Sequence, residues 1–292
     1  MSRVGMLATK AQVLHARRHA QPFMKAHEDE EEDKKALDRR ALSAHAVHTA
    51  LRSEGESELE REWTALAWSG LAAGLSMGLS MMVQGTLRAH LPDTPWRGLI
   101  SSFGYSVGFL AVVLGRQQLF TETTLTACLP LLHSPSKAMF GNVVRLWIVV
   151  FASNMLGALV FAWVAAQPSA FDAEVRQAFS QIAQEAIAHG AWNAFVRAII
   201  GGWIIALMVW LLPSAESARP WIVIFMTYGL AAANLTHIIA GSIDVFYGIA
   251  VSEISWGTYF WGYGLPVLAG NSIGGIVFVA LLNHAQVAHK SD

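Results

Sequence analysis

The stretch Gly115-Arg-Gln-Gln-Leu-Phe-Thr-Glu-Thr-Thr-Leu125 interrupts an otherwise apolar run over residues 99–132. One helix needs only about 20 residues to cross the roughly 30 Å core of a bilayer, so this run is too long for a single unbroken crossing. Irregular backbone at membrane depth is tolerated only where protein buries it or water reaches it. The break therefore predicts the lining of a pathway through a membrane protein.

The composition excludes an ordinary soluble domain. Of the 292 residues, 54% are hydrophobic and only 14% are charged, which is far from the balance of a soluble protein. Eleven of the 20 Lys and Arg residues and 12 of the 21 Asp and Glu residues precede Trp63. We expect an all-α polytopic protein with the lipid bilayer as its solvent. The net charge of −1 and the single Cys128 give no indication of nucleic-acid binding or of a cysteine-based metal site.

Hydropathy predicts six crossings, of which the second and the fifth are broken. The fifth is broken around residues 234–244, at a place that corresponds to the first break in the other half of the chain. Three crossings per half give the halves opposite topology, which predicts an inverted three-plus-three repeat with its pathway at the midplane. The expected crossings are residues 63–87, 99–132, 143–166, 192–212, 221–256 and 259–284.

The charged ends of the chain predict its organisation and orientation. Residues 1–62 are expected to be a cytoplasmic segment with an amphipathic helix within 34–62. Residues 63–285 form the expected channel domain, and 286–292 a cytoplasmic tail. Because basic residues favour the cytoplasmic side, both termini are placed there, in a bacterial inner membrane.

Thr121 and His237 are the candidate substrate-contacting residues in the two breaks. A threonine hydroxyl can donate to a small anion or neutral molecule, and an imidazole can carry a proton near neutral pH. Each has a structural alternative: the Thr121 hydroxyl bonding the preceding turn, and His237 holding the broken backbone. The other charges in or beside the crossings are expected mainly in structural pairs or at interfaces: Arg116, Glu122, Arg145, Arg197, Asp244 and Glu253.

Nothing in the sequence is typical of an enzyme. The chain has no nucleotide-binding glycine motif, no ligand cluster with metal spacing and no nucleophile elbow. We therefore expect no catalysis and no cofactor.

Three motifs together resemble the formate/nitrite transporter family over about residues 60–285. They are Leu119-Phe120-Thr121 in the broken second crossing, His237 in the fifth, and Gly270-Asn271-Ser-Ile-Gly-Gly275 in the sixth. The resemblance implies an aquaporin-like fold and a homopentamer with one pore per protomer. It also implies small monovalent anions or their acids as substrates. In that family the threonine and histidine face each other in the pore.

The resemblance also places the remaining candidate residues. Phe120 and Thr236 stand beside the central pair. Apolar constrictions above and below it correspond to Tyr105, Phe109, Ile205, Leu230 and Ala240. Secondary polar positions are Arg116, Gln118, Glu122, Asn271 and Arg197.

Several positions depart from the family pattern and indicate a divergent member. Thr236 stands where an acidic residue precedes the histidine, and Gly241 and Gly202 stand where asparagines are usual. Arg116-Gln117-Gln118 replaces a Gly-Ala-acid lead. The vestibule lysine is missing, with His189 or Arg197 as candidate replacements.

The leading hypothesis is a passive or proton-linked pathway for a small monovalent anion or its conjugate acid. Because groups that gather anions are lost, a channel for a neutral solute or gas such as water, ammonia or hydrosulfide remains an alternative. A non-conducting membrane platform for assembly is a third.

Overall fold

The computed structural model describes residues 42–288, and these residues are all-helical apart from their connections. Expectations for residues 1–41 and 289–292 lie outside the described part. The chain divides into the units Met1–Leu42 and Ser43–Asp292. The second unit contains every helix described below.

Among residues 42–288, five helices are long and apolar enough to cross a membrane: Trp63–His90, Arg97–Leu114, Lys137–Ala165, Gly190–Ser214 and Thr258–Val287. They contain α3 (Trp63–His90), α4 (Arg97–Leu114), α7 (Lys137–Ala165), α9 (Gly190–Leu211) and α12 (Leu265–Gly275). The last one includes two π-helical stretches, Thr258–Gly264 and Ile276–Leu281, and ends in α13 (Leu282–Ala288). The expected fifth crossing is divided between two shorter helices.

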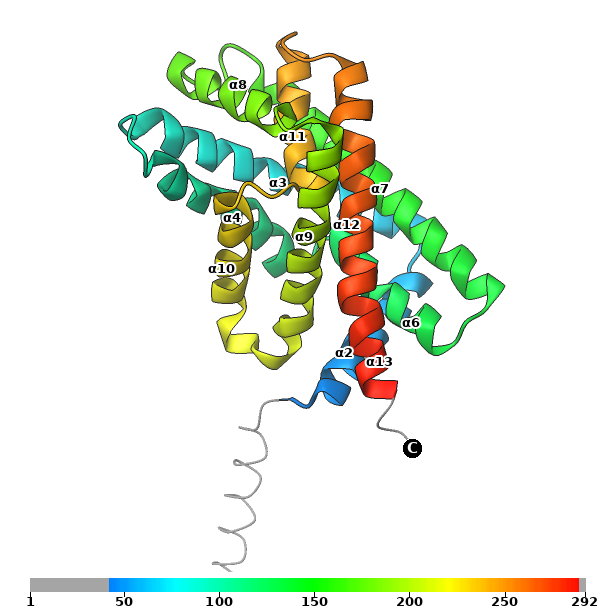
Figure 1. The fold of residues 1–292 in the computed structure, drawn as a ribbon. Coiled ribbons are helices and arrows are strands. Elements are labelled where there is room, and N and C mark those ends of the chain that lie inside the picture. Colours follow the sequence, from blue (N-terminus) through cyan, green and yellow to red (C-terminus); the bar gives the residue numbers. More distant parts are fainter. Residues whose placement is uncertain (1–41, 289–292) are drawn as a thin grey trace, which may run out of the picture. The chain divides into compact units, whose positions relative to one another are not determined.

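The shorter helices complete the two breaks and the ends of the bundle. They are α2 (Ala44–Glu60), α5 (Phe120–Thr126), α6 (Cys128–His133), α8 (Ala173–Ile187), α10 (Arg219–Ala232) and α11 (Ile238–Ala250). Within the unit Ser43–Asp292, α2 lies beside α13 at one end of the bundle, and α8 lies at the other end (Figure 1).

Small residues let two pairs of helices approach closely. A Cβ atom at Gly74 of α3 would lie 2.2 Å from the Asn154 carbonyl oxygen of α7. A Cβ atom at Gly202 of α9 would lie 2.2 Å from the Asn271 carbonyl oxygen of α12. Glycine is therefore required at both positions, as is usual where membrane helices touch. This close packing brings the two asparagines within reach of the breaks.

Both breaks are shorter than the sequence predicted, because residues 120–125 of the first expected break are already helical in α5. The helix α4 ends at Leu114 and α5 begins at Phe120. After α10 ends at Ala232, helix resumes at Ile238, so residues 238–244 are helical and not irregular. The correction has a physical cause: buried side chains bond the first amides of α11, as described next, so the helix can begin early.

Candidate functional site

One buried side chain holds the first break together. The Asn154 Oδ1 atom accepts a hydrogen bond of 2.9 Å from the Phe120 amide. Its Nδ2 donates to the carbonyl oxygens of Gln118 at 2.9 Å and Gly70 at 2.7 Å. Because buried backbone groups must be paired, this asparagine stabilises a non-helical segment at membrane depth.

The second break is built in the same way. The Asn271 Oδ1 atom accepts from the Ile238 amide at 2.8 Å. Its Nδ2 donates to the carbonyl oxygens of Thr236 at 3.1 Å and Ala198 at 2.8 Å. Asn271 was expected as a secondary polar position, and the structure places it behind the break as a support for the backbone.

Thr121 and His237 are joined directly by a hydrogen bond. The distance from Thr121 Oγ1 to His237 Nε2 is 2.7 Å, and both side chains are buried. His237 Nδ1 accepts from the Ala240 amide at 3.2 Å and so caps α11. We therefore assign the neutral ring proton to Nε2, which donates to Thr121 Oγ1. The hydroxyl hydrogen of Thr121 then remains available for donation, because within residues 42–288 its side chain makes no other hydrogen bond.

The residues expected to form the constrictions are all buried, and an aromatic ring lies against His237. The Phe109 ring lies edge-on to the His237 ring, with centroids 5.1 Å apart, and 5.4 Å from the ring of Tyr105. Ile205 and Leu230 are fully buried, and Ala240 is nearly so.

Phe120 and Thr236 lie beside the pair but point elsewhere. The Phe120 ring packs edge-on against the rings of Trp147 and Phe151 on α7, at 6.1 and 5.1 Å. The Thr236 hydroxyl donates to the Ala194 carbonyl oxygen of α9 at 2.8 Å. Both therefore hold neighbouring helices against the breaks.

A cavity of about 480 Å³ opens on the α8 side of the pair, and we call it the α8 cavity. His237, Gly241 and Asp244 line it from one face of α11, at the i, i+4 and i+7 positions. The remaining charged or phenolic lining residues are Arg88, Asp93, Arg97, Tyr105, Glu185, His189 and Tyr263.

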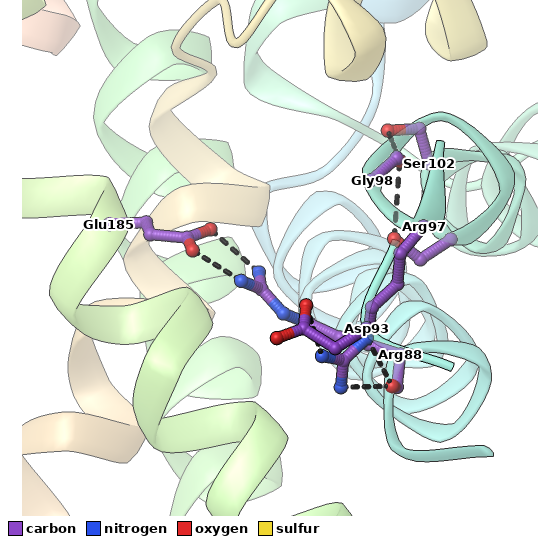
Figure 2. A network of polar contacts seen from close by, with 7 residues as sticks. Arg88, Asp93, Arg97, Gly98, Ser102 and Glu185 are labelled. Carbon is purple, nitrogen blue, oxygen red and sulfur yellow. Dashed lines mark hydrogen bonds and ion pairs between the residues drawn. The ribbon is translucent and has the colours of Figure 1, made fainter. Parts of the chain in front are cut away.

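The mouth of the α8 cavity carries a network of paired charges. Figure 2 shows the Arg88 guanidinium of α3 facing the Glu185 carboxylate of α8, to which it donates two hydrogen bonds. Arg97 forms an ion pair of 3.4 Å with Asp93 and also donates to the Arg88 carbonyl oxygen. Both arginines thus have partners in the protein, while the rim of the cavity stays strongly polar.

A second cavity of about 280 Å³ opens on the α2 side, and we call it the α2 cavity. Glu58 of α2 reaches into it and accepts from Gln118 Nε2 and Thr126 Oγ1, each at 2.8 Å. Burial raises the pKa of the Glu58 carboxyl above its ordinary value, against the effect of these two hydrogen bonds. Glu122 also lines this cavity, and its Oε1 atom is buried without a hydrogen-bond partner.

The sequence model of the formate/nitrite transporter family matches residues 45–285. The chain belongs to this family. A relative in Escherichia coli K12, named inner membrane protein YfdC, is 41% identical over 250 residues, which cover 86% of this chain and 81% of the relative. A probable formate transporter of Methanothermobacter thermautotrophicus is 26% identical over 238 residues, covering 74% of this chain and 82% of that protein.

Solved structures agree with the fold of this family member. A pentameric formate channel with formate bound matches with a TM-score of 0.66 and 19% identity, covering 77% of this chain and 97% of the channel. A channel described as an FNT family ion channel matches with a TM-score of 0.73 and 16% identity. The match covers 82% of this chain and 98% of that channel. The chain is therefore an all-helical integral membrane channel or transporter.

The three basic candidate residues of this family member lie at the second break or in the lining of a cavity. Arg197 donates to the Asn234 carbonyl oxygen at 2.8 Å and so holds the second break. His189, the other candidate replacement for the lysine, lines the α8 cavity. Arg116 lies 3.5 Å from Glu54 of α2 and lines the α2 cavity.

Several lining residues were missed from the sequence of this family member. Arg88 and Arg97 line the α8 cavity but were not among the residues expected to line the pathway. Tyr263 was missed as well, and its hydroxyl donates to the His237 carbonyl oxygen at 3.1 Å. A Cβ atom at Gly241 would lie 1.7 Å from that hydroxyl. The Tyr263 hydroxyl thus takes the space that a side chain at position 241 would need, which is a contact that only a structure shows.

Proposed function

We propose that this chain passes a small monovalent anion, or its conjugate acid, between the two cavities by way of Thr121 and His237. One observation carries the proposal. Thr121 lies between Gln118 and Glu122, which line the α2 cavity, and its hydroxyl is bonded to His237, which lines the α8 cavity. The pair therefore connects residues that line the two cavities by one hydrogen bond.

The chemistry of the pair suits a weak acid. Transferring a bare anion past the rings and aliphatic side chains around His237 costs several kcal/mol, roughly, whereas a neutral acid avoids most of that cost. The free hydroxyl hydrogen of Thr121 can donate to an oxygen of the substrate. His237 Nε2 supplies a second donor once its bond to Thr121 opens. Such a pathway is passive or proton-linked, and its flux rises as pH falls.

We also propose an internal repeat, an oligomeric state and an orientation in the membrane. Matching asparagine bonds in the two halves support an inverted three-plus-three repeat with six crossings, in an aquaporin-like fold. The pentameric formate channel among the structural neighbours supports a homopentamer with one pathway per protomer. We place residues 63–285 in the channel domain. The α2 cavity and both termini are placed on the cytoplasmic side of an inner membrane.

Flux measurements in liposomes test the function. The purified protein is reconstituted, and the entry of formate, nitrite, acetate, lactate and chloride is followed between about pH 5 and pH 8. We expect flux of at least one small carboxylate or nitrite, rising as pH falls. Thr121→Val removes the hydroxyl donor, and His237→Asn replaces the imidazole with a shorter, non-titrating side chain, so each should reduce the flux about tenfold or more. Asparagine is a good N-cap, so His237→Asn keeps α11 capped.

The proposal fails if no anion enters faster than in empty vesicles and His237→Asn changes nothing. One observation favours a neutral solute as the alternative cargo. Asp244 and Glu122 line the two cavities, and within residues 42–288 neither side chain has an ion-pair partner. Unpaired carboxyl groups disfavour bare anions. Swelling assays with water, ammonia and hydrosulfide would show that cargo directly.

A further inference from the structure

Asp244 is a buried carboxyl group that the proposed pathway does not yet use. Only 7% of the residue is exposed, and it lines the α8 cavity. It follows His237 by seven residues on α11, which corresponds to about 10 Å along the helix on the same face. Within residues 42–288 its side chain has no hydrogen-bond or ion-pair partner.

The cations around the α8 cavity are committed to other groups. Arg88 on α3 is bonded to Glu185 on α8, and Arg97 on α4 is paired with Asp93. His189 lines the cavity at the start of α9. Among the residues that line the α8 cavity, no lysine or arginine is left to pair with Asp244.

The remaining titratable neighbours of Asp244 are hydroxyl groups and the central histidine. Tyr105 of α4 and Tyr263 of the π-helical stretch 258–264 line the same cavity, as does His237 on the same helix. The Tyr263 hydroxyl is occupied by the His237 carbonyl oxygen. The other elements that pack on α11, α7 and α12, contribute no titratable group to the lining.

This setting suits a group that gives up and regains a proton. A carboxylate that is withdrawn from water without a counter-ion is costly, while a neutral carboxyl group is not. The α8 cavity is large enough for water and a small anion, and it opens to solvent at its charged rim. A substrate anion that enters the cavity therefore passes beside Asp244 before it meets Phe109 and His237.

We propose that Asp244 donates its proton to the substrate anion in the α8 cavity, so that the neutral acid enters the apolar constriction. The O–H bond of Asp244 breaks, and an O–H bond forms on an oxygen of the anion. Water of the cavity then returns a proton to the Asp244 carboxylate, so one proton crosses with each anion. The inference rests on the proposed function and assigns the proton to a specific group.

The test uses the full-length protein in liposomes, with formate as the probe and a series from about pH 5 to about pH 8. The variants are Asp244→Asn, which cannot donate a carboxyl proton, Asp244→Glu, which can, and His237→Asn. At the upper end of the series bulk formic acid is scarce, and Asp244→Asn should lower formate flux about tenfold or more, as expected for the loss of a general acid. At the lower end, bulk solvent supplies the acid and the variant should approach the wild-type rate. Asp244→Glu should keep the wild-type pH profile.

Two results would overturn the inference. An equal loss of flux at every pH would indicate a structural role, and a gain of flux near neutral pH would make Asp244 a barrier to anions. If Asp244→Asn does not yield folded protein by size-exclusion chromatography, Asp244→Ser carries the same expectations. If wild-type protein passes no formate and His237→Asn changes nothing, the proposed function itself has failed. If His237→Asn abolishes formate flux while Asp244→Asn acts equally at all pH values, only the inference about Asp244 has failed.

Discussion

The break between α4 and α5 and the break between α10 and α11 are built from nearly the same backbone bonds. Each contains one residue with positive φ, Arg116 at 53° and Asn234 at 51°. The following amide reaches back in both: Gln117 N to the Val112 carbonyl oxygen, and Leu235 N to that of Leu230, each at 3.0 Å. An asparagine from a third helix then holds the segment in each half.

The side chains at equivalent positions of the two breaks differ. The residue before the asparagine-bound amide is Leu119 in the first break and His237 in the second. Two residues later stand Thr121 and Ile239, so each break contributes one polar side chain to the central hydrogen bond. The backbone scaffold is duplicated while the polar chemistry is divided between the halves. Side chains next to the scaffold can diverge because one asparagine already satisfies the backbone.

The largest losses of stability are expected at the asparagines, where the two breaks are most alike. Asn154→Ala and Asn271→Ala each leave the amide and the carbonyl group of a buried break without the bond from the asparagine, and each also removes a bond to a helix carbonyl. Each unpaired buried group costs about 1–3 kcal/mol, so both variants should lose most of their folded yield. The measurement is thermal stability and monodispersity of the protein in detergent.

Asn193→Ala is the matched control, because this asparagine is exposed and bonds only a carbonyl one turn earlier on α9. It should retain wild-type stability. If either break variant is as stable as this control, the asparagines do not hold the breaks, and the comparison between the halves loses its physical basis.

A smaller effect is expected at a feature that only the second break has. Tyr263→Phe removes the bond from the phenol to the His237 carbonyl oxygen, which should cost about 1 kcal/mol. Gly241→Ala places a methyl group where the Tyr263 hydroxyl lies, and overpacking of this kind costs about 1–3 kcal/mol. Thermal unfolding in detergent measures both. Gly229→Ala is the control for the added methyl group, because a Cβ atom at Gly229 meets nothing within 4 Å.

The informative result is the order of the three losses of thermal stability. Gly241→Ala should destabilise more than Gly229→Ala and more than Tyr263→Phe. If Gly241→Ala has no effect, the Tyr263 hydroxyl does not occupy the space that a side chain at position 241 would need.

The sequence predicted the breaks because polar residues inside a long apolar run have few physical explanations. The position of Thr121 opposite His237 came from the family resemblance, since no spacing rule brings residues 116 positions apart together. The end of the second break was misplaced because the amide bonds made by Asn271 and His237 let α11 begin early, and hydropathy does not report such bonds.

Contacts between distant helices could not be read from the sequence. Glu58 on an amphipathic helix gives no sign that it reaches Gln118, and the pairing of Arg88 with Glu185 depends on the docking of α8 over α3. These contacts depend on the packing of whole helices. They also decide which charges line the cavities, so the charged rim of the α8 cavity was beyond sequence reasoning.

The smallest effect is expected at Glu58, where α2 meets the first break and the second break has no counterpart. Burial raises the pKa of Glu58 in the folded protein, so the docked state binds a proton more tightly than the undocked state. Docking of α2 should therefore weaken as pH rises above the ordinary carboxyl range, near 4.3. Glu58→Gln should remove this dependence and change docking by about 1 kcal/mol. Hydrogen exchange of the α2 amides, corrected for the intrinsic effect of pH, measures the stability of this docking.

Glu60→Gln, at an exposed position on the same helix, should keep the wild-type pH dependence. Identical pH profiles for Glu58→Gln and Glu60→Gln would show that the protonation of Glu58 does not contribute to the docking of α2.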